Sequence, residues 1–122
     1  MTDGAAGRFT ATVREGLSGP VVEAVGELDY DNALILRTAL HRALAVRPAP
    51  PTLVVGLAGL TFCDSSGLNT LLQARIEAAR HGTVIHLARP AHAVSRLLEM
   101  TGAAQLFPVV QEIPALPHTR AG

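Results

Sequence analysis

The residues best suited to chemistry in this chain run from Asp64 to Gly67, with Cys63 directly before them. They offer a carboxylate, a thiol and two hydroxyls that can accept a phosphoryl group, those of Ser65 and Ser66. Aspartate and serine are also strong helix N-cap residues, because a short side-chain oxygen accepts hydrogen bonds from the free N–H groups of the first turn. Those N–H groups and the positive end of the helix dipole tolerate a phosphate. The pattern therefore indicates either a plain helix cap or a hydroxyl that is modified.

Cys63 is the strongest candidate for an enzyme nucleophile, since a thiol beside a helix N-terminus can have a lowered pKa. No histidine or asparagine is identifiable as its partner, and the charge of Asp64 disfavours a thiolate. A small apolar packing role is the preferred interpretation, and an enzyme that uses Cys63 remains an alternative. As the chain has one cysteine, it cannot form an internal disulfide, which indicates a reducing compartment and hence a cytoplasmic protein.

The sequence lacks the spacings typical of phosphate cradles and metal sites. It contains no G-x-x-x-x-G-K, no G-x-G-x-x-G, no H-E-x-x-H and no paired-cysteine motif. We therefore expect no metal, no cofactor and no catalytic residue. The histidines are scattered over predicted helix surfaces, a helix end, a strand and the C-terminal segment, and we assign none of them a catalytic role: His41, His81, His86, His92 and His118.

Composition restricts the class of protein further. The chain has 122 residues, which suits one domain, and 48% of them are hydrophobic, although only 3% are aromatic. Ten basic and ten acidic side chains give a formal net charge of zero, which argues against nucleic acid or an anionic membrane surface as the main partner. No apolar run approaches the roughly 20 residues of a membrane span, and the N-terminus does not resemble a signal peptide.

Hydrophobic periodicity predicts alternating strands and helices. The order is ββαβαβαβ, which predicts an α/β fold with a single, mainly parallel sheet and right-handed crossover helices. The short turn after the first strand allows that strand to run antiparallel, and Pro108 predicts an edge position for the last strand. The expected strands are residues 9–13, 21–26, 53–57, 83–87 and 107–110. Two expected helices follow residues 31–32 and 64–67, and the third has Pro90 in its first turn.

The apolar residues of each predicted helix define the face that we expect to be buried. Glycines at 82 and 102 are placed to end the second and third helices. Residues 53–57 are apolar at every position, which is typical of an interior parallel strand. The expected buried faces are Ala33, Leu36, Leu40, Ala43 and Leu44 in the first helix; Leu68, Leu71, Leu72, Ile76 and Ala79 in the second; and Val94, Leu97 and Leu98 in the third.

Two loops should meet at one edge of this sheet. In parallel units the loops that leave the carboxyl ends of strands share an edge, where sites of α/β domains collect. That rule brings the acidic segment 27–31 to the loop 64–67. An acidic loop is usually only solvated, but this position makes it a candidate contact surface. The candidate partner-binding residues are Glu27, Leu28, Asp29, Tyr30, Asp64, Ser65, Ser66 and Gly67.

Three segments resemble the STAS family, and within it the bacterial anti-sigma factor antagonists. Residues 26–29, Gly-Glu-Leu-Asp, look like the family's strand-end motif. Residues 60–68 are similar to its L-x-F-x-D-S-S/T-G-L loop, which is the most specific of the three. Residues 90–102 resemble the helix that follows the penultimate strand. The resemblance implies a STAS domain over residues 9–110. The small and polar residues before it predict a disordered N-terminus (1–8), and the prolines after it predict a loose tail (111–122).

The resemblance implies a function by partner switching. The unmodified antagonist would bind an anti-sigma factor, which then releases its sigma factor. That anti-sigma factor would also be a serine kinase, and it would phosphorylate the serine directly after the aspartate, here Ser65. A serine phosphatase would reverse the modification, and ATP and Mg²⁺ would belong to the kinase.

The sequence departs from the family pattern at two places. Cys63 stands where a larger apolar residue is common, and the family's C-terminal helix is missing or replaced by residues 111–122, which contain Pro114 and Pro117.

A second interpretation is a scaffold or transport-complex subunit with a STAS domain in which Ser65 is never phosphorylated. The retained Asp64 and Ser65 favour the antagonist.

Overall fold

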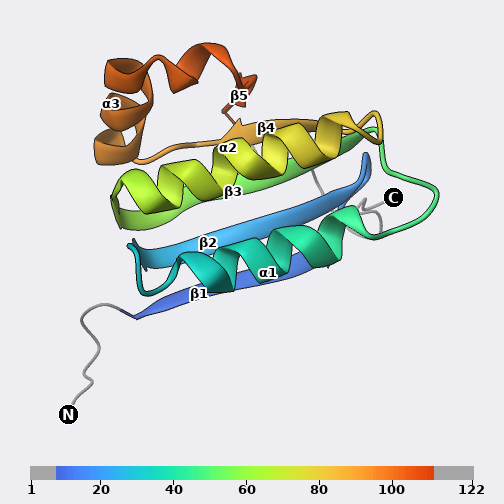
Figure 1. Ribbon diagram of the computed structural model, residues 1–122, viewed down its shortest axis with the longest axis horizontal. Coiled ribbons are helices and arrows are strands. Elements are labelled where there is room, and N and C mark those ends of the chain that lie inside the picture. Colours follow the sequence, from blue (N-terminus) through green and yellow to red (C-terminus); the bar gives the residue numbers. More distant parts are fainter. Residues whose placement is uncertain (1–7, 112–122) are drawn as a thin grey trace, which may run out of the picture.

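The computed structural model describes residues 8–111, which form a five-stranded sheet with three α-helices (Figure 1). The strands lie in the order β1-β2-β3-β4-β5; β1 is antiparallel to β2, and the other neighbours are parallel. The elements are β1 (Phe9–Glu15), β2 (Pro20–Leu28), α1 (Ala33–Leu44), β3 (Thr52–Cys63), α2 (Ser65–Ala79), β4 (Val84–Ala88), α3 (His92–Thr101), the 3₁₀ helix η1 (Ala103–Gln105) and β5 (Val109–Val110).

This arrangement confirms the predicted α/β class, the element order, the antiparallel first strand and the edge position of β5. The strand order, which the sequence left open, is sequential. Right-handed crossovers between strands placed side by side in chain order put every helix on the same face of the sheet. Accordingly, the main core contains Leu36, Leu71 and Leu98 from α1, α2 and α3. The small cluster on the opposite face, Val21, Val54 and Ala88 with the partly buried Val110, contains no helical residue.

The third strand is the centre of the sheet, as predicted, and residues 53–57 are all buried. It is longer than predicted, however, because it continues to Cys63, whereas residues 60–63 were expected to lie in a loop. β2 likewise continues to Leu28. The two strands pair in parallel over this extension, with Gly26 opposite Leu60. Backbone pairing between neighbours thus carries the strands past Gly26 and Gly59, although glycine has a weak strand preference.

The predicted face of α1 is confirmed in its larger residues, although Ala33 is only half-buried and Ala39 is buried in addition. In α3 the residues Val94 and Leu98 are buried, and Gly102 ends the helix with a left-handed φ of 81°. Pro90 does not lie in the first turn of α3, as was predicted, because the helix begins at His92.

The predicted face of α2 is partly wrong. Ile76 is 51% exposed and Ala79 is exposed, whereas Ala74 and Ala78 are buried with Leu68 and Leu71. Small residues face the sheet here because α2 begins in close contact with it. The spacing of the large apolar side chains therefore predicted a buried face that is shifted by about one residue from the face observed.

The predictions for the terminal segments, disordered residues 1–8 and a loose tail at 111–122, fall outside the described residues except at Arg8 and Gln111.

The corrected face of α2 can be tested with two truncations. Leu71 is fully buried, so Leu71→Ala should lower the free energy of unfolding by about 2–5 kcal/mol. Ile76→Ala truncates a half-exposed side chain and should change it by about 0.5 kcal/mol or less. Urea denaturation followed by circular dichroism measures both. Equal losses in the two variants would mean that the helix packs on the other face.

Candidate functional site

The two candidate loops lie side by side at the carboxyl ends of β2 and β3, as predicted. Leu28 and Cys63 are paired in the parallel ladder, and the backbone N–H of Asp64 donates to the carbonyl oxygen of Leu28 at 3.2 Å. Each loop therefore leaves the sheet at the same height as the other. The sheet fixes their relative position before any side chain contributes.

Asp64 is the N-cap residue of α2, as predicted, and its backbone is extended (φ −105°, ψ −171°). Its Oδ1 accepts from the backbone N–H groups of Ser66 and Gly67, at 3.0 and 3.1 Å, and from the Ser66 hydroxyl at 2.6 Å. The Ser66 hydroxyl is the main cause that lowers the pKa of Asp64; the backbone N–H groups of Gly67, Ser66 and Tyr30 add to this, against the opposing effect of burial. Because Tyr30 belongs to the β2–α1 loop, the carboxylate also links the two loops.

The two serines have different environments. The Ser66 side chain is half-buried, and its hydroxyl is occupied by Asp64. Ser65, the first residue of α2, is exposed, and its hydroxyl has no hydrogen-bond partner among residues 8–111. Ser65 therefore presents a free hydroxyl to solvent at the N-terminus of a 15-residue helix.

Leu28 and Gly67, two of the candidate partner-binding residues, lie in the interior. A Cβ added at Gly67 would lie 2.6 Å from Cγ of Leu28 and 3.1 Å from Sγ of Cys63. Real Cβ atoms do not approach a side chain that closely, so glycine allows the first turn of α2 to pack against the ends of β2 and β3. Both residues position the loops, and neither presents a side chain to a partner in this conformation.

The β2–α1 loop is held by its own polar groups. The backbone N–H of Asn32 donates to Oδ1 of Asp29 at 3.1 Å, and the Asn32 side chain donates to the carbonyl oxygen of Glu27 at 2.9 Å. Asn32 occupies the N-cap position of α1, but its side chain does not cap that helix. Tyr30 remains 81% exposed. The loop is thus an ordered support that presents one aromatic ring beside Ser66.

The Cys63 thiol is not poised for catalysis. Burial, and secondly the charge of Asp64, raise the pKa of Cys63 to about 11. The thiol stays protonated at neutral pH, and its S–H lies 3.5 Å from the carbonyl oxygen of Asp64. Its packing against the main core supports the preferred interpretation of a small apolar residue.

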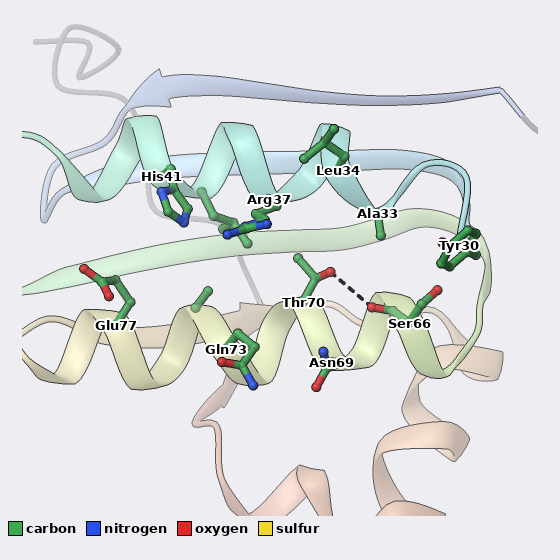
Figure 2. Close-up of a pocket in the computed structure, with 12 residues that line it drawn as sticks. Tyr30, Ala33, Leu34, Arg37, His41, Ser66, Asn69, Thr70, Gln73 and Glu77 are labelled. Carbon is green, nitrogen blue, oxygen red and sulfur yellow. Dashed lines mark hydrogen bonds between the residues drawn. The ribbon is translucent and has the colours of Figure 1, made fainter.

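A groove of about 540 Å³ lies between α1 and α2 and ends beside the candidate loops (Figure 2). Tyr30 and Ser66 line that end, and Leu40 and Ala74 lie in the lining as well. Sequence reasoning missed this surface, since it treated the residues off each buried stripe as solvated. Its other lining residues are Ala33, Leu34, Arg37, His41, Asn69, Thr70, Gln73 and Glu77.

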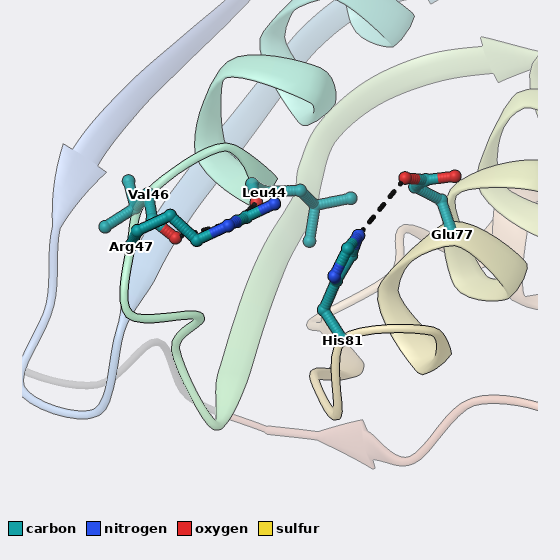
Figure 3. A network of polar contacts seen from close by, with 5 residues as sticks. All are labelled: Leu44, Val46, Arg47, Glu77 and His81. Atoms are coloured by element: carbon teal, nitrogen blue, oxygen red, sulfur yellow. Dashed lines mark hydrogen bonds and ion pairs between the residues drawn. The ribbon is translucent and has the colours of Figure 1, made fainter.

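Beyond the far end of the groove, short polar contacts hold the ends of the two helices (Figure 3). The Arg47 guanidinium donates to the carbonyl oxygens of Leu44 and Val46, at 2.8 and 3.0 Å. Just after α2, Nε2 of His81 lies 3.5 Å from Oε2 of Glu77. The Arg47 guanidinium lies at the carboxyl end of α1, where a cation near the free carbonyl groups is favourable.

Within residues 8–111 no three side chains of histidine, cysteine, aspartate or glutamate gather in a group that could hold a metal ion. No helix in the same range has the length and apolar character needed to cross a membrane.

The family comparison is decisive for the fold. The family model described as "Mlab, STAS domain" matches residues 11–111. The chain belongs to the STAS domain family. The matched range contains both loops, the N-cap Asp64 and the groove, so the site lies wholly within the STAS domain.

Two relatives carry the name of anti-sigma factor antagonist. The anti-sigma-F factor antagonist RsfA of Mycobacterium tuberculosis is 29% identical over 99 residues, which cover 81% of this chain and 77% of that protein. The crystal structure of an anti-sigma factor antagonist from Mycobacterium paratuberculosis has a TM-score of 0.72 and 27% identity, and the match covers 87% of this chain and 88% of that chain.

More distant structures share the STAS fold alone. The phosphorylated form of the Bacillus cell fate determinant SpoIIAA has a TM-score of 0.63 and 22% identity, covering 84% of this chain and 93% of that chain. A sulfate transporter family protein from Wolinella succinogenes has a TM-score of 0.69 and 16% identity, covering 82% of each chain. The fold therefore occurs in proteins named for transport as well as for sigma-factor regulation.

The cap at Asp64 makes stability depend on pH. Asp64→Ala should lower the free energy of unfolding by about 0.5–2 kcal/mol at neutral pH. Because the pKa of Asp64 in the folded protein lies below its ordinary value of 3.8, the carboxylate's contribution is complete above that value and is lost as the pH falls through the folded pKa. The stability difference between wild type and variant should therefore shrink below about pH 4. Asp64→Asn, which caps without titrating, is the control; an Asp64→Ala deficit that is constant down to pH 2 would contradict this account.

The reactivity of Cys63 tests the enzyme alternative. With a pKa of about 11 in place of 9.0, the thiolate fraction at neutral pH should be roughly a hundredfold below that of an unperturbed thiol. Alkylation by iodoacetamide should be correspondingly slow and should still accelerate above pH 9. The same protein unfolded in urea is the control. Fast alkylation of the folded protein at pH 7 would restore Cys63 as a candidate nucleophile.

Proposed function

We propose that this protein is an anti-sigma factor antagonist that is switched by phosphorylation of Ser65. Its unphosphorylated form binds an anti-sigma factor that is also a serine kinase, and a sigma factor is freed. The kinase transfers phosphate to Ser65 and binding is lost; a serine phosphatase restores it. The protein acts in the cytoplasm, needs no cofactor of its own and catalyses no reaction.

The observation that carries this proposal is the difference between the two serines. Ser65 offers an exposed hydroxyl with no partner in the described part of the chain, whereas the hydroxyl of Ser66 is bound to Asp64 at 2.6 Å. A kinase needs an accessible acceptor, and Ser65 meets this need without rearrangement of the cap. The likeness to the antagonist RsfA supports the same role.

Phosphorylation at this position suits a switch that leaves the fold intact. A phosphoserine adds about −1.5 to −2 charge at neutral pH. At Ser65 the N-terminal dipole of α2 offsets part of that charge locally, so the domain tolerates it. A partner packed over the loop instead meets a bulky hydrated dianion beside Asp64. Burial of such a group without a cation is costly, and the complex dissociates.

The contact surface follows from which candidate side chains are accessible. Tyr30 and Ser65 are exposed, and Glu27, Asp29, Asp64 and Ser66 are partly exposed. We assign the contact to these residues. Leu28 and Gly67 contribute to the contact indirectly, because their close packing sets the distance between the start of α2 and the end of β2.

A second candidate function is that of a STAS subunit in a transport complex, in which Ser65 is not phosphorylated. The fold that this chain shares with a sulfate transporter family protein favours it. The two candidates differ in one measurable property, the change in partner affinity on phosphorylation of Ser65.

Substitutions at Ser65 test the switch. Ser65→Ala should bind the anti-sigma factor about as tightly as wild type and resist phosphorylation, since only an exposed hydroxyl is lost. Ser65→Asp should bind at least about tenfold more weakly, because it places a second carboxylate beside Asp64, although one charge mimics phosphate incompletely. Isothermal titration against each anti-sigma factor encoded in the same genome, with phosphate mapped by mass spectrometry after incubation with ATP, measures both effects.

Ser66→Ala is the matched control, since it should remain a substrate for phosphorylation at Ser65. Phosphate found only on Ser66, or equal affinities for Ser65→Ala, Ser65→Asp and the phosphorylated protein, would rule out Ser65 as the switch. A partner that binds all of these forms equally would favour the transport-complex candidate.

A further inference from the structure

The groove between α1 and α2 continues from the proposed contact surface along both helices (Figure 2). At the end that it shares with Ser66, two apolar side chains are largely uncovered: Tyr30 is 81% exposed and Leu34 is 65% exposed. Large apolar groups at this level of exposure, gathered beside a contact surface, are typical of a docking site. The groove therefore extends the surface available to a partner beyond the phosphorylation loop.

The wall that α1 contributes is cationic. Arg37 lines the groove one turn after Leu34, and it forms no hydrogen bond or ion pair with any residue of the described range 8–111. The opposite wall beside it is formed by the neutral residues Asn69, Thr70 and Gln73. The acidic lining residue, Glu77, lies further along and is 3.5 Å from His81. The middle of the groove thus holds an arginine that has no counter-charge among residues 8–111.

We propose that the anti-sigma factor inserts an amphipathic helix into this groove, with an apolar side chain against Tyr30 and Leu34 and a carboxylate paired with Arg37. This inference rests on the proposed function and adds to it the chemistry of the partner's binding segment. The spacing of Leu34 and Arg37 is one helical turn, so the matching apolar and acidic residues on the partner lie three or four positions apart.

A helix is the occupant that fits the shape of this site. The lining residues of α1 and of α2 each recur at three- and four-residue spacing, so the groove is bounded by two rows of side chains. The row of side chains on a third helix packs between such rows. A carboxylate on that helix can form a bidentate pair with Arg37, which specifies register as well as adding affinity.

Charge reversal at two arginines of α1 tests the inference. Arg37 lines the groove, whereas Arg42, five residues later on the same helix and also exposed, does not. In titrations with the anti-sigma factor that binds wild type, Arg37→Glu should weaken binding at least about tenfold, while Arg42→Glu should stay within about threefold.

A photo-cross-linking residue at Gln73 should attach to a helical segment of the partner that carries a carboxylate, and the same residue at Thr12 on β1 should not. Reversing that carboxylate to lysine should recover most of the affinity lost by Arg37→Glu.

The outcomes separate the inference from the function on which it rests. If Ser65→Asp weakens binding but Arg37→Glu binds like wild type with its fold intact, the switch holds and the groove is not the docking site. Equal losses in Arg37→Glu and Arg42→Glu would mean long-range attraction rather than a pair in the groove, and would also overturn the inference. If no anti-sigma factor binds the wild-type protein, both the proposed function and the inference fail.

Discussion

The parallel pairing of β2 with β3 is the interaction on which the site depends. The ladder continues to Leu28 and Cys63, past Gly26 and Gly59, which have a weak strand preference. It therefore delivers two loops, 36 residues apart at Leu28 and Asp64, to one edge, where a backbone hydrogen bond of 3.2 Å joins them. If the ladder ended at Gly26, the cap of α2 and the Tyr30 loop would no longer share a surface.

Asp64 caps α2 directly after the end of the β2–β3 ladder. One carboxylate oxygen orders the first turn of α2 and accepts from the Ser66 hydroxyl, whereas Ser65 remains exposed. The neighbouring glycine lets that turn lie directly on Leu28. The proposed phosphorylation of Ser65 would need no catalytic group in this chain, because a kinase would supply the chemistry.

The single helical layer determines the surface next to Ser66. Sequential strand order with right-handed crossovers places α1 and α2 side by side on one face. Their buried stripes face the sheet, and the residues between the stripes line a groove that leads away from Ser66. A doubly wound order, with helices on both faces, would have separated these helices. The groove, and the place of Arg37 in its lining, are therefore consequences of topology rather than of any one motif.

The sequence by itself determined the fold class, the alternation of strands and helices, the meeting of the two loops and the cap at Asp64. These features follow from local patterns: periodicity, turn residues, and the rule that parallel strands share an edge for their outgoing loops. The resemblance of residues 60–68 to the STAS family could also be recognised from the sequence, because that motif is continuous in the chain.

Only the tertiary structure decided the strand order, the true face of α2, the interior position of Leu28 and the groove along Arg37. Each of these depends on contacts between segments distant in the chain. Ile76 has the character of a core residue, but the close approach of α2 at Gly67 turns the small residues Ala74 and Ala78 toward the sheet. Local preference is weak compared with such packing, so the sequence located the two loops and the cap at Asp64, while the fold determined the surface around them.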